Sequence, residues 1–152
     1  MQRQMLKSKI HRATVTACDV DYVGSVTIDA DLMRQADLLP NEQVHLWDVE
    51  NGARAVTYAI EAPAGSGTIQ VNGAAARLVR EGHKVIIVSY GTYDDRDLGG
   101  HSPIVVRVDD RNRFTAVDGN VDVAPVNVDG SGPADELPGA LGRGTAIAAG
   151  LS

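Results

Sequence analysis

The chain has 152 residues and a formal net charge of −6 at pH 7, from 14 Lys and Arg against 20 Asp and Glu. This length favours one compact domain over two independent ones. The negative charge disfavours nucleic acid as a partner, because a phosphate backbone attracts basic proteins. Aromatic residues make up only 4% of the chain, so we expect a core of Val, Ile, Leu and Ala, whose β-branched members favour strands.

Cysteine and histidine usage points to a reducing compartment. The single cysteine, Cys18, excludes an internal disulfide, and the four histidines show no metal-ligand spacing. The first residues are basic but lack the apolar run of a secretion signal, and no stretch approaches the roughly 20 apolar residues of a membrane helix. We therefore expect a cytoplasmic protein without metal or membrane contact.

Taken in chain order, the first predicted elements are strands followed by one helix. Alternating residue types predict extended structure over residues 4–18 and a strand over residues 26–28. Apolar residues then recur at helical spacing as far as Leu39. We expect this helix to begin at a cap formed by Asp29 or Asp31, and to be closed by Pro40 and Asn41.

The middle of the chain predicts a hairpin. Apolar runs over residues 44–49 and 54–60 flank Asn51 and Gly52, a pair typical of a type I′ turn because both central residues need positive φ. The segment 63–67, PAGSG, predicts the next turn.

Three further strands are predicted over residues 68–71, 84–90 and 104–108. After the first of them, Gly73 precedes three alanines. This run suits a tight turn that opens a short helix and lets a ligand approach the backbone closely.

The C-terminal part differs in composition. Residues 118–152 are rich in Gly, Ala and Pro and contain no aromatic residue. Burial of so few large apolar groups cannot offset the entropy lost on ordering such a segment. We expect a flexible tail there and a mainly β domain with short helices over residues 1–117.

Gly24 and Ser25 lie between a predicted turn and a strand. A Gly-Ser pair is usually no more than part of a turn. In a strained backbone, however, the Ser25 hydroxyl can attack the Gly24 carbonyl and convert the amide to an ester, after which elimination and hydrolysis leave a pyruvoyl group on residue 25. Glycine favours this because it accepts dihedrals that other residues resist.

Four stretches of the sequence resemble the aspartate 1-decarboxylase family, whose members use a pyruvoyl group to make β-alanine for pantothenate. The stretches are MLKSKIHRATVT (5–16), DYVGSVTID (21–29), NGARAVTYAI (51–60) and VNGAAARLV (71–79). The resemblance is in register from about residue 1 to 93 and continues more weakly to about 117. It implies a double-psi β-barrel, a homotetramer with active sites between subunits, and self-cleavage between residues 24 and 25.

The resemblance also implies three groups of functional residues. The cleavage residues are Gly24, Ser25, Thr57 and Asn72. The catalytic residues are Ser25, as the pyruvoyl group, and Tyr58, as the proton donor. The residues that bind L-aspartate are Lys9, His11, Arg54, Thr57, Gly73, Ala74 and Ala75.

Elementary chemistry agrees with these roles. A pyruvoyl carbonyl can form a Schiff base with the amino group of L-aspartate and accept the electrons left when the α-carboxylate departs as CO2, without metal or pyridoxal phosphate. Arg54 can grip a substrate carboxylate with paired hydrogen bonds. Lys9 and His11, two residues apart on a strand, point to the same face. Thr57 and Tyr58 are adjacent, so a regular strand points them to opposite faces.

Other interpretations stay open. By strand pattern alone, Tyr58 is a half-buried aromatic residue and Arg54 solvates a turn, while Trp47 and Cys18 are structural. The alternative function is a non-cleaving β-barrel that binds or regulates, such as a DNA-binding module using the basic cluster over residues 7–12. Whether cleavage is spontaneous or needs a maturation factor is also open.

Overall fold

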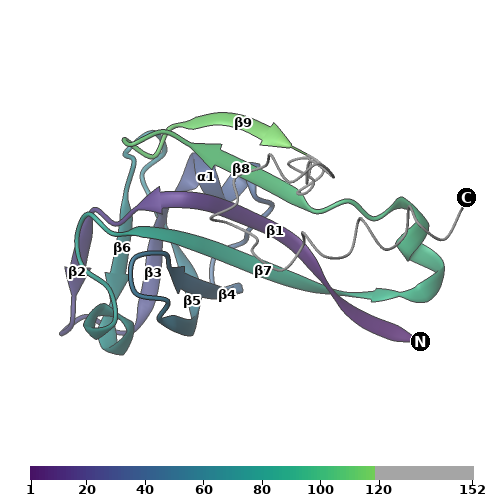
Figure 1. Cartoon of the computed structure of the whole chain (residues 1–152), viewed down its shortest axis with the longest axis horizontal. Helices are drawn as coiled ribbons and strands as arrows, with labels where there is room; N and C mark the ends of the chain where they lie inside the picture. The colour runs from purple at the N-terminus through teal and green to yellow at the C-terminus, as the bar shows by residue number, and fades with distance from the viewer. Residues whose placement is uncertain (119–152) are drawn as a thin grey trace, which may run out of the picture. The chain divides into compact units, whose positions relative to one another are not determined.

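A computed structural model describes residues 1–118 and shows them as a nine-stranded sheet with short helices (Figure 1). The tail predicted for residues 118–152 lies outside the described residues after its first position. The elements are β1 (Gln2–Thr14), β2 (Ala17–Asp19), β3 (Ser25–Asp29), α1 (Ala30–Gln35), β4 (Gln43–Asp48), β5 (Arg54–Ala62), β6 (Ile69–Asn72), the 3-10 helix η1 (Gly73–Arg77), β7 (Lys84–Asp94), the 3-10 helix η2 (Asp95–Gly100), β8 (Ile104–Val108) and β9 (Phe114–Asp118).

The strands follow the order β2-β6-β3-β5-β4-β7-β1-β8-β9. Three pairs are parallel, namely β1 with β8, β2 with β6 and β3 with β5, and the other neighbours are antiparallel. The prediction of a mainly β fold is confirmed, and this mixed sheet is consistent with a double-psi β-barrel. No helix within residues 1–118 is long and apolar enough to cross a membrane.

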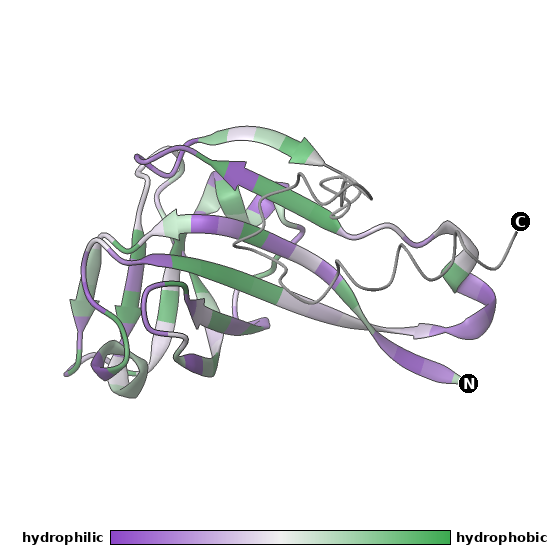
Figure 2. Ribbon diagram, in the orientation of Figure 1, coloured by the Kyte–Doolittle hydropathy of each residue, from purple (hydrophilic) through white to green (hydrophobic). Residues whose placement is uncertain are grey.

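The core is aliphatic, as the composition predicts. Within the described residues its buried hydrophobic side chains are Val, Ile, Leu and Ala with one methionine, Met33. On β3, Val26 and Ile28 are fully buried, and Val71 and Ile69 lie directly opposite them on β6. Figure 2 shows the same apolar character along β7 and β8 and a hydrophilic N-terminal end of β1. Each fully buried Val, Ile, Leu or Met side chain of this core stabilises the fold by about 1.5–3 kcal/mol.

Asp29 fixes the end of β3. It caps α1, because its side chain accepts the N–H of Asp31 at 2.8 Å, and this confirms one of the two predicted caps. The same carboxylate accepts the N–H groups of Gly65 at 3.0 Å and Gly67 at 2.8 Å. Asp29 thereby joins the predicted turn over residues 63–67 to the strand that begins at Ser25.

The helix α1 ends at Gln35, so the prediction that it continues to Leu39 is wrong. Asp37 has a φ of 52°, and the N–H of Leu38 donates to the carbonyl of Met33 at 2.9 Å. This is a Schellman C-cap, in which a left-handed residue ends the helix. A periodic apolar pattern does not reveal this left-handed residue.

The predicted hairpin of β4 and β5 is confirmed, but its turn is not type I′. Gly52 has a φ of 73°, whereas Asn51 does not have a positive φ. The loop is longer, because the N–H of Asp48 donates to the carbonyl of Ala53 at 2.9 Å. The Asn51 side chain instead accepts the N–H of Ala53 and donates to the carbonyl of Leu78, both at 2.8 Å.

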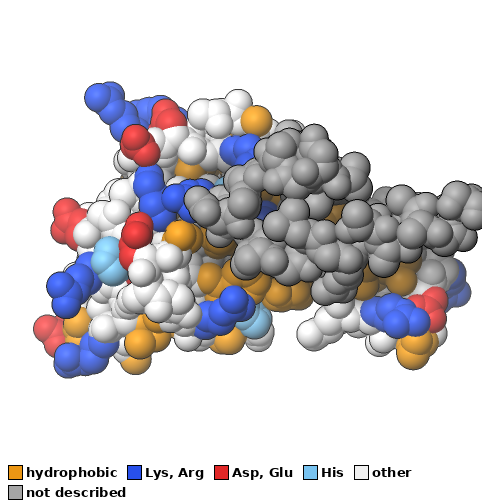
Figure 3. Space-filling view, in the orientation of Figure 1, with side chains coloured by type: hydrophobic (Ala, Val, Ile, Leu, Met, Phe, Trp, Pro, Cys, Tyr) orange, Lys and Arg blue, Asp and Glu red, His pale blue; other side chains and the backbone are white. Residues whose placement is uncertain are grey.

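The charged side chains do not form a basic surface on the face shown in Figure 3. Lys and Arg side chains are interspersed there with Asp and Glu. This distribution, like the net charge of −6, does not favour a nucleic-acid partner.

Candidate active site

The junction between Gly24 and Ser25 lies where β3 begins, beside the end of β6 (Figure 1). Ser25 is fully buried and directly opposite Asn72. The Asn72 Nδ2 donates to the Ser25 Oγ and to the Thr27 Oγ1, both at 2.9 Å, and the Asn72 Oδ1 accepts from the Gln70 Nε2 at 2.8 Å. These four side chains, Ser25, Thr27, Gln70 and Asn72, are called the Asn72 cluster below.

Strand alternation explains why these polar side chains meet. On β3 and β6 they alternate with the core residues, so the Asn72 cluster occupies the face of the two strands opposite to Val26 and Val71. Asn72 is only 1% exposed, and its amide is satisfied by the cluster. A buried amide that is fully hydrogen-bonded is held in one place, and here it holds the Ser25 hydroxyl.

The turn from β6 into η1 packs closely against the backbone of Gly24. Gly73 has a φ of 68°, and a Cβ added there would lie 2.6 Å from the Gly24 Cα and 2.8 Å from its N. Only glycine fits such a backbone contact. The predicted tight turn and short helix are confirmed, with Ala74 and Ala75 next in η1.

Thr57 and Tyr58 lie on β5, the parallel neighbour of β3. The register pairs Val26 with Ala59, and when it is continued toward the N-terminus it sets Tyr58 beside Ser25 and Thr57 beside Gly24. Neither β5 pairing contains a register shift, so the two side chains point to opposite faces, as alternation predicts. Alternation thus puts Tyr58 on the face of Ser25 and Thr57 on the opposite face of the sheet.

Arg54 is held at the other end of β5 by an aromatic ring. Its guanidinium carbon lies 4.4 Å from the centroid of the Trp47 ring, a cation–π contact that orients the planar group. Trp47, interpreted from the sequence as structural, therefore also positions this cation. Arg54 precedes Tyr58 by four residues, which is about 13 Å along an extended strand.

Lys9 and His11 lie on β1 and alternate with the buried Ser8 and Ile10, so they share a face as predicted. In the strand order, however, β7, β4 and β5 separate β1 from β3. Strand pairing thus brings Gly24, Ser25, Asn72 and Gly73 together, whereas Lys9 and His11 lie on a strand that does not pair with β3.

Thr27 and Gln70 belong to the site although the sequence analysis did not select them. Each is a polar residue between two core positions, in the runs SVTID and TIQVN. That signal is visible in the sequence. What is not visible is that β3 and β6 pair, because the hydrogen bond between Asn72 and Thr27 joins residues 45 positions apart.

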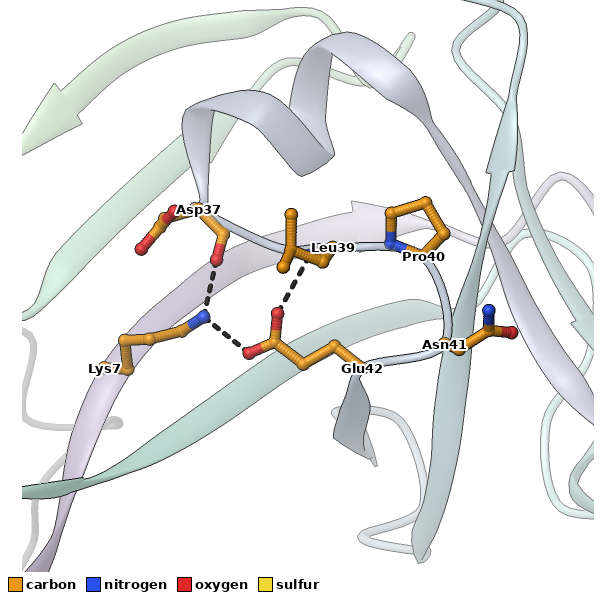
Figure 4. A pocket seen from close by; sticks show the side chains of 6 residues that line it. All are labelled: Lys7, Asp37, Leu39, Pro40, Asn41 and Glu42. Atoms are coloured by element: carbon orange, nitrogen blue, oxygen red, sulfur yellow. Dashed lines mark hydrogen bonds and ion pairs between the residues drawn. The ribbon is translucent and has the colours of Figure 1, made fainter.

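A surface pocket of about 450 Å³ lies elsewhere, between Lys7 on β1 and the segment after α1 (Figure 4). Its two partly buried charges, on Lys7 and Glu42, pair with each other. The Lys7 Nζ lies 2.5 Å from both the Asp37 carbonyl oxygen and the Glu42 Oε1, and the Glu42 Oε2 accepts the N–H of Leu39 at 2.8 Å. This ion pair ties β1 to the α1–β4 connection, and we assign it a structural role.

The described residues form a mainly β fold that buries Ser25 beside the hydrogen-bonded amide of Asn72, and comparison with known proteins gives the class of enzyme. Residues 1–115 match the family model described as aspartate decarboxylase. The chain is 59% identical over 117 residues to the aspartate 1-decarboxylase of Moorella thermoacetica, covering 77% of this chain and 91% of that protein. It is 56% identical over 116 residues to the aspartate 1-decarboxylase of Heliobacterium modesticaldum, covering 76% and 88%. The chain belongs to the aspartate decarboxylase family, a family of carboxy-lyases, and the alternative of a non-enzymatic module is not favoured.

Proposed function

We propose that this chain is a self-processing, pyruvoyl-dependent enzyme that converts L-aspartate to β-alanine and CO2 for pantothenate synthesis. Family membership supports the reaction and the substrate. The observation that carries the self-processing is the buried Ser25 hydroxyl, which accepts a hydrogen bond from the Asn72 amide and follows a Gly24 backbone packed closely against Gly73.

The cleavage balances as a rearrangement followed by elimination. The Ser25 Oγ attacks the Gly24 carbonyl carbon, the bond from that carbon to the Ser25 nitrogen breaks, and the hydroxyl proton passes to the nitrogen. Loss of the Ser25 Cα proton then breaks the Cβ–Oγ bond and releases Gly24 as a carboxylate. Water displaces the nitrogen as ammonia and leaves a ketone on residue 25, so one water is consumed and one ammonia is released.

The residues around the junction fit this sequence of steps. Burial of Ser25 keeps bulk water from the ester. Thr57, on the strand that pairs with β3, is the proposed donor to the oxyanion formed on the Gly24 carbonyl. The close contact of Gly73 with Gly24 restricts the peptide that must rearrange.

The pyruvoyl group supplies an electron sink for the carboxylate that leaves. Tyr58, on the face of Ser25, is the proposed donor of the proton that returns to the α-carbon. The backbone of Gly73, Ala74 and Ala75 is proposed to orient the substrate. Its two carboxylates are assigned to the cations described above, which are Lys9, His11 and Arg54.

The position of Lys9 and His11 on a strand that does not pair with β3 supports a homotetramer with active sites between subunits. Exposed apolar residues lie on β5 and before the junction, with Val56 60% exposed between Arg54 and Tyr58, and Tyr22 and Val23 50% and 76% exposed before Gly24. A neighbouring copy that covers these residues would bring its own cations to Ser25. The proposed catalytic domain is residues 1–117, and the free Cys18 fits the proposed cytoplasmic location.

The test uses L-aspartate labelled with ¹³C in its α-carboxylate. The account predicts labelled CO2 and unlabelled β-alanine from the full chain, and neither product from Ser25→Ala. Ser66→Ala is the matched control, because Ser66 lies in an exposed turn that precedes β6, at the end of the strand away from Asn72. Turnover by Ser25→Ala would refute the pyruvoyl mechanism, and formation of alanine with the label retained would refute α-decarboxylation.

A further inference from the structure

We propose that Gln70 is a positioning residue for self-cleavage, because it fixes the Asn72 amide so that Nδ2, rather than Oδ1, faces the Ser25 hydroxyl. The inference rests on the proposed self-processing. It assigns a role to a residue that touches neither the scissile bond nor the substrate.

The geometry singles out Gln70 within the Asn72 cluster. The two ends of an asparagine amide have almost the same shape, so packing does not choose between them. The hydroxyls of Ser25 and Thr27 can each donate or accept, so they do not choose either. In the structure the Gln70 Nε2 donates to the Asn72 Oδ1 at 2.8 Å, and this bond is compatible only with the orientation in which the Asn72 Nδ2 points to Ser25.

The orientation matters because negative charge moves onto Oγ during cleavage. When the Cβ–Oγ bond breaks, Oγ leaves as an oxygen of the Gly24 carboxylate, and a donor beside it stabilises the developing charge. A reversed Asn72 amide would instead place the lone pairs of Oδ1 next to the Ser25 Oγ, and their repulsion of the developing negative charge would slow breakage of the Cβ–Oγ bond. With Nδ2 donating to Oγ, the hydroxyl proton is also directed away from Asn72 and is free to leave.

The test compares three variants of the full chain with wild type. Gln70→Met keeps the length of the side chain and removes its donor. Gln70→Glu introduces a carboxylate that, when ionised, accepts from Asn72 and favours the reversed amide. Gln35→Met is the matched control, since Gln35 is also partly buried but lies at the end of α1.

Each chain is made in a reconstituted translation system whose only cellular proteins are those of the translation machinery. Synthesis is then stopped, and the uncut fraction is followed by intact mass spectrometry at pH 4.5 to 8. We expect Gln35→Met to cleave at the wild-type rate and Gln70→Met to cleave at least about tenfold more slowly at every pH. Gln70→Glu should be slow at pH 8 and approach wild type toward pH 4.5, because a protonated carboxyl, with an ordinary pKa of about 4.3, regains a donor. Unfolding temperatures close to wild type would exclude general destabilisation.

The outcomes separate this inference from the proposed function. If wild type stays uncut, the self-processing fails and the role of Gln70 with it. If wild type cleaves and Gln70→Met cleaves at the same rate, only the role of Gln70 is overturned. If both Gln70 variants are slowed by the same factor at all pH values, the residue acts through packing, and the orientation argument is wrong.

Discussion

The close approach of Gly73 to Gly24 makes Gly73→Ala the most informative single substitution. The added Cβ would meet the Gly24 Cα at 2.6 Å and its N at 2.8 Å, whereas ordinary contact begins at 3.4 Å. The backbone of the junction must therefore shift by about 0.8 Å. Both atoms belong to the main chain, so no side chain can rotate away to relieve the contact.

Two costs add at this position. An alanine at a φ of 68° costs about 1–2 kcal/mol, and forcing apart a packed contact costs about 1–3 kcal/mol more. Gly82→Ala is the matched control, because Gly82 has a φ of 87° and nothing within 4 Å of an added Cβ. We expect losses of unfolding free energy of about 2–5 kcal/mol for Gly73→Ala and about 1–2 kcal/mol for Gly82→Ala.

The assay has two parts. Urea unfolding is measured with Ser25→Ala present in every chain, so that cleavage does not complicate the comparison. Cleavage is measured with Ser25 intact, and Gly73→Ala should slow it at least about tenfold, since small misplacements of reacting groups cost large factors in rate. Equal stability of the two glycine variants, together with cleavage of Gly73→Ala at the wild-type rate, would refute the claim that this contact holds the junction.

Three further outcomes are expected. Tyr58→Phe should cleave normally but decarboxylate about 10²–10⁴-fold more slowly, and unchanged turnover would mean that another group returns the proton. Arg54→Lys should raise the KM for aspartate about tenfold in steady-state kinetics, because a point charge replaces neither the planar fork nor its contact with Trp47; an unchanged KM would remove Arg54 from the site. Burial, and then the charge of Glu81, raise the pKa of the Cys18 thiol. Iodoacetamide should therefore alkylate Cys18 more slowly than it alkylates free cysteine at pH 8, and the rate for Cys18 should increase as the pH is raised above 8. Equal rates for Cys18 and free cysteine at pH 8 would contradict this.

Features set by neighbours in the chain were predictable from the sequence. The Asp29 cap, the paired strands of the hairpin and the tight turn at Gly73 all depend on a few consecutive residues. The errors also have local causes. Side-chain hydrogen bonds of Asn51 replace the expected type I′ turn, and left-handed Asp37 ends the helix early.

Features set by pairing between distant strands were not predictable from residue patterns. Nothing in the sequence shows that Asn72 bonds to both Gln70 and Ser25, because the register of β6 against β3 is a tertiary property. The placement of Lys9 and His11 on β1, which does not pair with β3, is likewise a consequence of strand order. The resemblance supplied the candidate site residues, and the structure adds Gln70 and Thr27 as hydrogen-bond partners of Asn72.

The central claim is that the chain makes its own ketone from Ser25, and an intact mass spectrum under denaturing conditions tests it most directly. The account predicts a 24-residue fragment ending at Gly24 and a 128-residue fragment that reacts with a carbonyl-trapping amine. Their summed mass should exceed that of the uncut chain by about 1 Da, because one water is gained and one ammonia lost. A single 16.0 kDa species, or two fragments whose summed mass is about 18 Da higher and which do not react with the amine, would contradict it.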